Sequence, residues 1–289
     1  MPESTIADFV ARFLPDSNRQ VDPTKGRVVL SQKRLVLVSG DGRTTIPLAD
    51  VFDVVVGHVP VGLSKFFDDT VAIAYARRDD RMTAIVEADG ETITRFRTVL
   101  FKALLQGCSV SVRHPAQIGG RRTGAAAQTG ELRLREGAVR LVGLEEPLTI
   151  ELSAVTHFSR VDRTMDGETR PTLEVQFTDA GRTITSEIVL STPRRMNLLG
   201  RYLRLEYSNL AAEIRDIELP DSEVQLLTAI YSGADLGDLS GVLGMESSSV
   251  MMLVNSIEEK GLLVTSEEGT TLTSLGRLAV SDRVEDING

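Results

Sequence analysis

The chain has 289 residues, of which 42% are hydrophobic and 25% are charged, and its formal net charge is -9. This composition is ordinary for a water-soluble protein of two or three small domains, and no apolar run approaches the ~18 residues that a membrane span needs. The single cysteine, Cys108, excludes an internal disulfide framework, and the early acidic residues Glu3 and Asp8 argue against a secretory signal, so we expect a cytoplasmic protein.

Residues 6–14 carry apolar side chains at helical spacing. Ile6, Phe9, Val10, Phe13 and Leu14 would share one face of a helix that ends before Pro15. We therefore expect an amphipathic N-terminal helix. It would either pack on the first domain or dock in a groove of a partner.

An internal duplication follows. Residues 28–51 return as residues 132–155, shifted by 104 positions, and residues 70–75 return as residues 172–177, shifted by 102. A helical set also recurs 100 positions later: Phe96, Val99 and Ala103 as Met196, Leu199 and Leu203. Repetition at a fixed period indicates that one structural unit occurs twice.

Each copy predicts six or seven short strands followed by one amphipathic helix, over residues 94–106 and 193–207. Asp-Gly pairs at 41–42, 89–90 and 166–167, with Ala180-Gly181, indicate hairpin turns. A bent antiparallel sheet capped by a C-terminal helix is the layout of pleckstrin-homology-like domains. We expect an α+β protein with two such domains in tandem, at 1–113 (including the N-terminal helix) and 114–218.

The last segment, residues 219–289, has a different pattern. Helices are predicted at 221–231 and 238–243 and after the serines at 247–249, followed by a hairpin at 264–272 and a final helix that opens at Thr273. This is the order of a winged helix-turn-helix. From residue 220 onward there are 12 acidic and 3 basic residues, so this segment carries -9 and the rest of the chain carries 29 charges of each sign.

The third predicted helix of this segment supplies the candidate site. If Val250, Leu253, Val254 and Ile257 face inward, the neighbouring side chains face outward. A DNA-reading helix needs Arg, Lys, Asn or Gln at those positions, whereas flexible Met side chains suit protein partners. Met251 and Met252 would otherwise pack against another domain of this chain. The predicted partner-binding residues are Met251, Met252, Asn255, Glu258 and Glu259.

No motif predicts catalysis. His58, His114 and His157 are far apart and lack second ligands at metal spacing, and Gly119–Gly124 lacks the Lys-Ser/Thr ending of a phosphate loop. We predict no catalytic, cofactor-binding or metal-binding residue and no cofactor. The loop at 58–67, with Leu63, Phe66 and Phe67, would plug the first sheet or present an apolar contact.

Several strings resemble the archaeal taxis adaptor family CheF: residues 6–13 (IADFVARF), residues 66–73 (FFDDTVAI) and the winged C-terminal segment. The resemblance spans nearly the whole chain. It implies a non-enzymatic chemotaxis adaptor that joins a CheY-type response regulator to the switch complex of the archaellum, the archaeal swimming motor. It also implies contacts with CheC and CheD taxis proteins.

Two other functions remain open from the sequence. One is a transcription regulator whose winged segment reads DNA, which the charge of residues 247–270 opposes. The other is a membrane-surface module, for which Arg121-Arg122 and Lys25–Arg27 are the basic candidates. We expect neither nucleic-acid binding nor direct membrane binding, and the sequence leaves a homodimer open.

Overall fold

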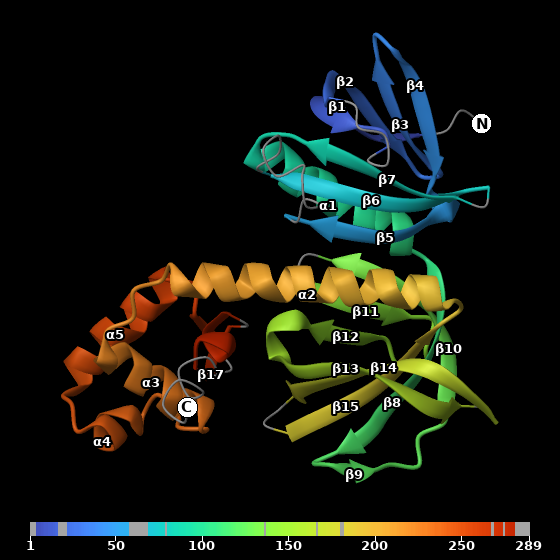
Figure 1. The fold of residues 1–289 in the computed structure, drawn as a ribbon. Coiled ribbons are helices and arrows are strands. Elements are labelled where there is room, and N and C mark those ends of the chain that lie inside the picture. Colours follow the sequence, from blue (N-terminus) through green and yellow to red (C-terminus); the bar gives the residue numbers. More distant parts are fainter. Residues whose placement is uncertain are drawn as a thin grey trace.

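Two antiparallel sheets and a group of helices form the fold of this chain (Figure 1). The computed structural model describes residues 4–16, 22–57, 69–78, 80–135, 137–165, 167–179, 182–266, 269–273 and 275–280. The predicted loop at 58–67 and residues 267–268 of the predicted hairpin lie outside these residues. None of the described helices is long and apolar enough to cross a membrane.

The first sheet has the strand order β4-β3-β2-β1-β7-β6-β5. It is followed by helix α1 (Gly90–Leu105), and the short turn η1 (Leu48–Asp50) joins β4 to β5. The strands are β1 (Thr5–Leu14), β2 (Thr24–Ser31), β3 (Arg34–Ser39), β4 (Gly42–Pro47), β5 (Val51–Val56), β6 (Thr70–Arg77) and β7 (Asp80–Glu87).

The second sheet repeats this order as β12-β11-β10-β8-β15-β14-β13, with β9 paired to β8. The turn η2 (Leu152–Ala154) stands where η1 stands in the first copy, and helix α2 (Pro193–Arg215) follows. The duplication predicted from the sequence is therefore confirmed. The strands are β8 (Cys108–Ile118), β9 (Arg121–Arg122), β10 (Ala127–Arg135), β11 (Ala138–Val142), β12 (Leu148–Glu151), β13 (Val155–Met165), β14 (Glu168–Asp179) and β15 (Arg182–Leu190).

The N-terminal segment is a strand, so the predicted amphipathic helix is wrong. β1 pairs with β2 along most of its length and with β7 at its end. Ala11 and Phe13 are buried at the two-residue period of a strand, whereas Val10, which the helical pattern placed inward, is 61% exposed. An apolar stretch of this length fits the helical period as well as the strand period. Its pairing with two neighbouring strands makes it a strand.

The helix boundaries also differ from the prediction. Asp89 and Gly90 form no hairpin turn, because Asp89 is the N-cap of α1 and its Oδ1 accepts the Thr92 amide at 3.0 Å. That hydrogen bond lowers the pKa of Asp89 below its usual value. Helix α2 begins at Pro193, as predicted, but it continues to Arg215 rather than ending near Tyr207.

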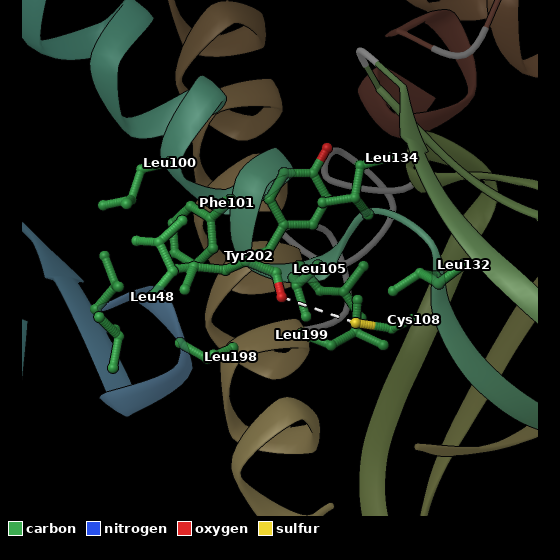
Figure 2. Packing of buried hydrophobic residues seen from close by; sticks show 14 of the residues in the cluster. Leu48, Leu100, Phe101, Leu105, Cys108, Leu132, Leu134, Leu198, Leu199 and Tyr202 are labelled. Atoms are coloured by element: carbon green, nitrogen blue, oxygen red, sulfur yellow. Dashed lines mark hydrogen bonds between the residues drawn. The ribbon is translucent and has the colours of Figure 1, made fainter. Parts of the chain in front are cut away.

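The two sheets share one hydrophobic core, which α1 and α2 complete. Figure 2 shows its centre, where Leu48 of the first copy and Leu132 of the second meet side chains of both helices. The rings of Phe101 and Tyr202 lie 5.7 Å apart at a tilt of 57°. Cys108 is buried in this core, and burial raises the pKa of its thiol.

Two arginines fix α2 against the first sheet. The Arg194 guanidinium donates to the carbonyl oxygens of Leu48, at 2.8 Å, and Ala49. Arg201 donates from Nε and Nη2 to the two carboxylate oxygens of Asp53 on β5, at 3.0 and 3.1 Å. These contacts give α2, the helix of the second copy, a defined position against β5 of the first.

A second hydrophobic core lies at the far end of α2. It is built from α3 (Asp221–Tyr231), α4 (Leu239–Leu243), α5 (Ser247–Glu259), β16 (Leu263–Ser266), β17 (Gly269–Leu272) and the helical residues 275–280. Ile214 of α2 is buried in it, and Leu210 packs against both cores. At ~1.5 Å per residue, α2 is about 35 Å long and spans from one core to the other (Figure 1).

Candidate partner-binding surface

Helix α5 has one buried face and one exposed face. Val250, Val254 and Ile257 are buried and Leu253 is half-buried, as predicted. Met251 is 47% exposed and Met252 is 67% exposed, so neither is packed away in the interior of this chain. Asn255 and Glu259 are also exposed, whereas Glu258 is half-buried. The structure thus brings the five predicted site residues onto or beside one accessible helix surface.

Exposed apolar side chains concentrate in this part of the molecule. Among the described residues, nine large hydrophobic side chains are exposed, and five of them lie between residues 231 and 264. Apart from the two methionines, these are Tyr231, Val242 and Val264, which are 45%, 60% and 52% exposed. Single exposed apolar residues are normal and a contiguous patch of them marks an interaction site, so we take this unit as the candidate.

The basic residue at the end of α5 is already engaged. Lys260 Nζ lies 2.5 Å from Glu223 Oε2 and donates to the Glu218 carbonyl oxygen at 2.8 Å. Ser256 Oγ donates to Glu223 Oε1 at 2.7 Å, and Glu223 is buried at 3% exposure. The inward face of α3 therefore includes the charged residue Glu223, which an apolar periodicity cannot predict. Lys260 is held by Glu223 rather than directed outward.

We expect Glu223→Gln to destabilise the C-terminal core by about 1–3 kcal/mol, because Lys260 would lose its buried counter-charge. Glutamine retains the size of the side chain and an acceptor for Ser256, so the change tests charge rather than packing. Hydrogen exchange of the α3 and α5 amides in the full chain measures this local stability. Unchanged exchange would contradict a stabilising role for the pair.

The described residues show no reactive cluster. No group of three or more His, Cys, Asp or Glu among them could hold a metal ion. His114 stacks on Phe177 and its Nδ1 lies 2.7 Å from Ser186 Oγ, and burial lowers the pKa of the imidazole. Cys108 contacts the Leu104 carbonyl oxygen. His114 and Cys108 thus have separate surroundings, and His58 lies outside the described residues.

Two grooves beside α2 had no signal in the sequence, because distant segments form them. One, of about 500 Å³, lies between β5, β13 and α2 and is lined by Arg160, Arg201 and Arg204. The other, of about 1,030 Å³, lies between β1, α1 and α2 and carries both signs of charge, including Arg97 and Glu213. The charged side chains that line the first groove are therefore mostly cationic, whereas those of the second are mixed.

Comparison with known proteins decides the family. The family model described as "Archaeal Chemotaxis signal transduction system protein F" matches residues 5–209. The chain belongs to the CheF family of archaeal taxis proteins. The resemblance found in the sequence is therefore confirmed, and the chain has a role in archaeal chemotaxis signalling.

Two members of the CheF family from Halobacterium salinarum align along nearly their whole length. "Taxis protein CheF2" is 47% identical over 288 residues, which is 100% of both chains. "Taxis protein CheF1" is 26% identical over 297 residues and 98% of both chains.

Two solved structures are similar to part of this chain at low sequence identity. A C-terminal domain of an unknown protein from Leishmania infantum, 12% identical, has a TM-score of 0.27 and covers 35% of this chain and 85% of its own. Inner Membrane Complex Sub-compartment Protein 3 from Toxoplasma gondii, also 12% identical, has a TM-score of 0.26 over 38% and 77%. Scores this low carry no argument about the fold.

Proposed function

We propose that this chain is a non-enzymatic adaptor that links a phosphorylated CheY-type response regulator, together with CheC and CheD proteins, to the archaellum switch complex. The observation that carries the proposal is the exposed Met251–Met252 pair on α5. The regulator docks on this surface, with Met251, Met252 and Asn255 at the centre and Glu258 and Glu259 at the rim.

The chemistry of the surface supports a protein partner. Exposed methionines supply apolar area that adapts to the shape of a partner, and apolar contacts at the centre of an interface supply most of the binding energy. The glutamates at the rim set the encounter rate and the orientation. DNA is disfavoured, because the exposed positions of α5 hold no Arg or Lys and Lys260 is paired with Glu223.

The proposal also assigns a domain type to each part of the chain. We propose that 1–113 and 114–218 are pleckstrin-homology-like units and that 219–289 is a winged-helix unit, located in the cytoplasm. The matching strand orders support the first assignment, and the succession of α3, α4, α5, hairpin and final helix supports the second. The predicted join at 113/114 falls inside β8, and residues 108–113 pair with β10 and β15, so these residues go with the second unit; the join at 218/219 follows α2.

The test is calorimetric titration of the full chain with a CheY-type regulator from the same organism, with and without beryllofluoride as a phosphoryl mimic. We expect the mimic to tighten binding. We expect Met251→Asp to weaken it by about tenfold or more, because a charge would replace a central apolar contact.

Val10→Asp is the matched control, because Val10 is also an exposed apolar residue, at 61%, but lies on β1 of the first sheet. It should leave the affinity for the regulator unchanged. If the regulator fails to bind in either state, the adaptor proposal is wrong. Equal losses in Met251→Asp and Val10→Asp would instead remove α5 as the site.

A further inference from the structure

The groove of about 500 Å³ lies beside α2, between β5 of the first sheet and β13 of the second. Phe52 and Asp53 of β5 form one wall, residues 158–160 of β13 form another, and α2 contributes residues between Met196 and Arg204. Figure 1 shows β5 on one side of α2 and the second sheet on the other. Phe158, Leu173 and Met196 give the groove an apolar floor.

One wall of the groove is the open edge of a strand. β13 is the last strand of its sheet and pairs only with β14 among the described residues. Phe158, Ser159 and Arg160 are consecutive and all line the groove. Because successive side chains of a strand point to opposite faces, three consecutive lining residues place the groove along the backbone edge of β13. Such an edge presents unpaired N–H and C=O groups that can pair with another strand.

The polar side chains of the groove are mainly cationic. Arg160 donates to Asn197 Oδ1 at 2.9 Å, and Arg201 is paired with Asp53. Arg204 is exposed and makes no hydrogen bond or ion pair with a described residue. With Asp53 as the one acidic lining residue, three arginines give the groove a formal charge of +2. The groove is thus cationic, although the net charge of the whole chain is -9.

Gly200 lines the groove without contributing a side chain. It lies in the interior of α2, where glycine is less favourable than alanine, and a Cβ at this position would meet no atom within 4 Å. Neither a turn nor a close backbone contact therefore requires glycine here. The missing side chain leaves space in the wall of the groove instead.

We propose that this groove binds an acidic, extended segment of a partner protein, which pairs with the backbone edge of β13 and places carboxylates against Arg160 and Arg204. Strand addition satisfies the open edge, and the arginines select for acidic side chains. In the adaptor proposed above, on which this step rests, the segment belongs to the switch complex. The α5 surface is on the unit at the other end of α2, so both partners can bind at once.

The experiment measures binding of the full chain to two immobilised probes by biolayer interferometry: the purified switch-complex proteins of the same organism, and a decaglutamate peptide at low salt. We expect Arg204→Glu to weaken binding of both probes by about tenfold, because the reversed charge would face carboxylates at short range. Gly200→Leu should also abolish binding of both probes by filling the groove, although leucine favours the helix and should not lower the melting temperature.

Two controls separate the groove from general effects. Arg43→Glu makes the same charge change at an exposed position of β4 and should leave binding unchanged. Gly200→Ala adds only a methyl group and should retain most of the binding. The phosphoryl-mimic regulator should bind all four variants like the wild type.

The outcomes are distinct. Loss of both probes in Arg204→Glu and Gly200→Leu supports the groove as the motor-side contact. If decaglutamate binds at the groove but the switch complex does not bind the wild type, the groove is a site for acidic segments. The proposal that its partner is the switch complex is then wrong. If both groove variants bind the probes like the wild type, or decaglutamate fails to bind the wild type, the proposal is overturned.

Discussion

Tyr202→Ala is expected to lower the free energy of unfolding by about 3–5 kcal/mol, which is the usual cost of removing a large aromatic side chain from a packed core. Tyr202 is 2% exposed and stacks at a tilt on Phe101 of α1, and its hydroxyl donates to the Arg135 carbonyl oxygen at 3.1 Å. Tyr202 therefore joins its own helix, α2, to α1 and β10 where the two copies meet (Figure 2).

Because the two sheets share this core, the loss should affect both of them together. We expect Tyr202→Ala to unfold in urea in one transition, with its midpoint at a lower urea concentration than in the wild type. The circular dichroism of the sheets monitors this unfolding. Tyr202→Phe retains the ring and loses one hydrogen bond, so its cost should be about 0.5–1.5 kcal/mol. Separate transitions for the two sheets would show that the shared core does not couple them.

The duplication was the part of the fold that the sequence predicted best. Matching apolar patterns 104 positions apart correspond to the equivalent turns η1 and η2 and to the same strand order. The N-terminal strand was mispredicted because Ile6, Phe9 and Phe13 fit a helical period, and the partners that make them a strand lie elsewhere in the chain. Local periodicity cannot report pairing between distant segments.

The exposed face of α5 could be predicted for a related reason. Val250, Val254 and Ile257 set the buried face of a single helix, so the outward position of Met251, Met252 and Asn255 follows from local geometry. The groove lined by Arg160, Arg201 and Arg204 could not be predicted. Asp53, Arg160 and Arg204 come from three distant segments, and only the packing of both sheets against α2 brings them together.

Glu187→Ala is the second substitution with a large expected effect, again about 3–5 kcal/mol of unfolding free energy. Glu187 of β15 is 1% exposed and its carboxylate lies 2.6 Å from Arg113, 3.4 Å from Arg163 and 3.7 Å from Arg122. These arginines come from β8, β13 and β9, so one carboxylate connects four strands of the second sheet.

The cost of Glu187→Ala arises from the arginines that remain without their counter-charge. Arg113 would keep a positive charge at 19% side-chain exposure with its closest carboxylate gone, and an uncompensated buried charge is more costly than the pair is favourable. Because the group is buried, added salt should restore little of the lost stability. Urea unfolding at low and high salt measures both effects.

Glu131→Ala provides the comparison on β10 of the same sheet. Glu131 and Arg133 are 3.9 Å apart and each is 55% exposed, so solvent screens this pair and its loss should cost no more than about 1 kcal/mol. Equal costs for the two substitutions would mean that burial does not strengthen the Glu187 network. A large cost for Glu187→Ala alone would show that the buried carboxylate, together with its three arginines, stabilises the second sheet far more than the exposed pair does.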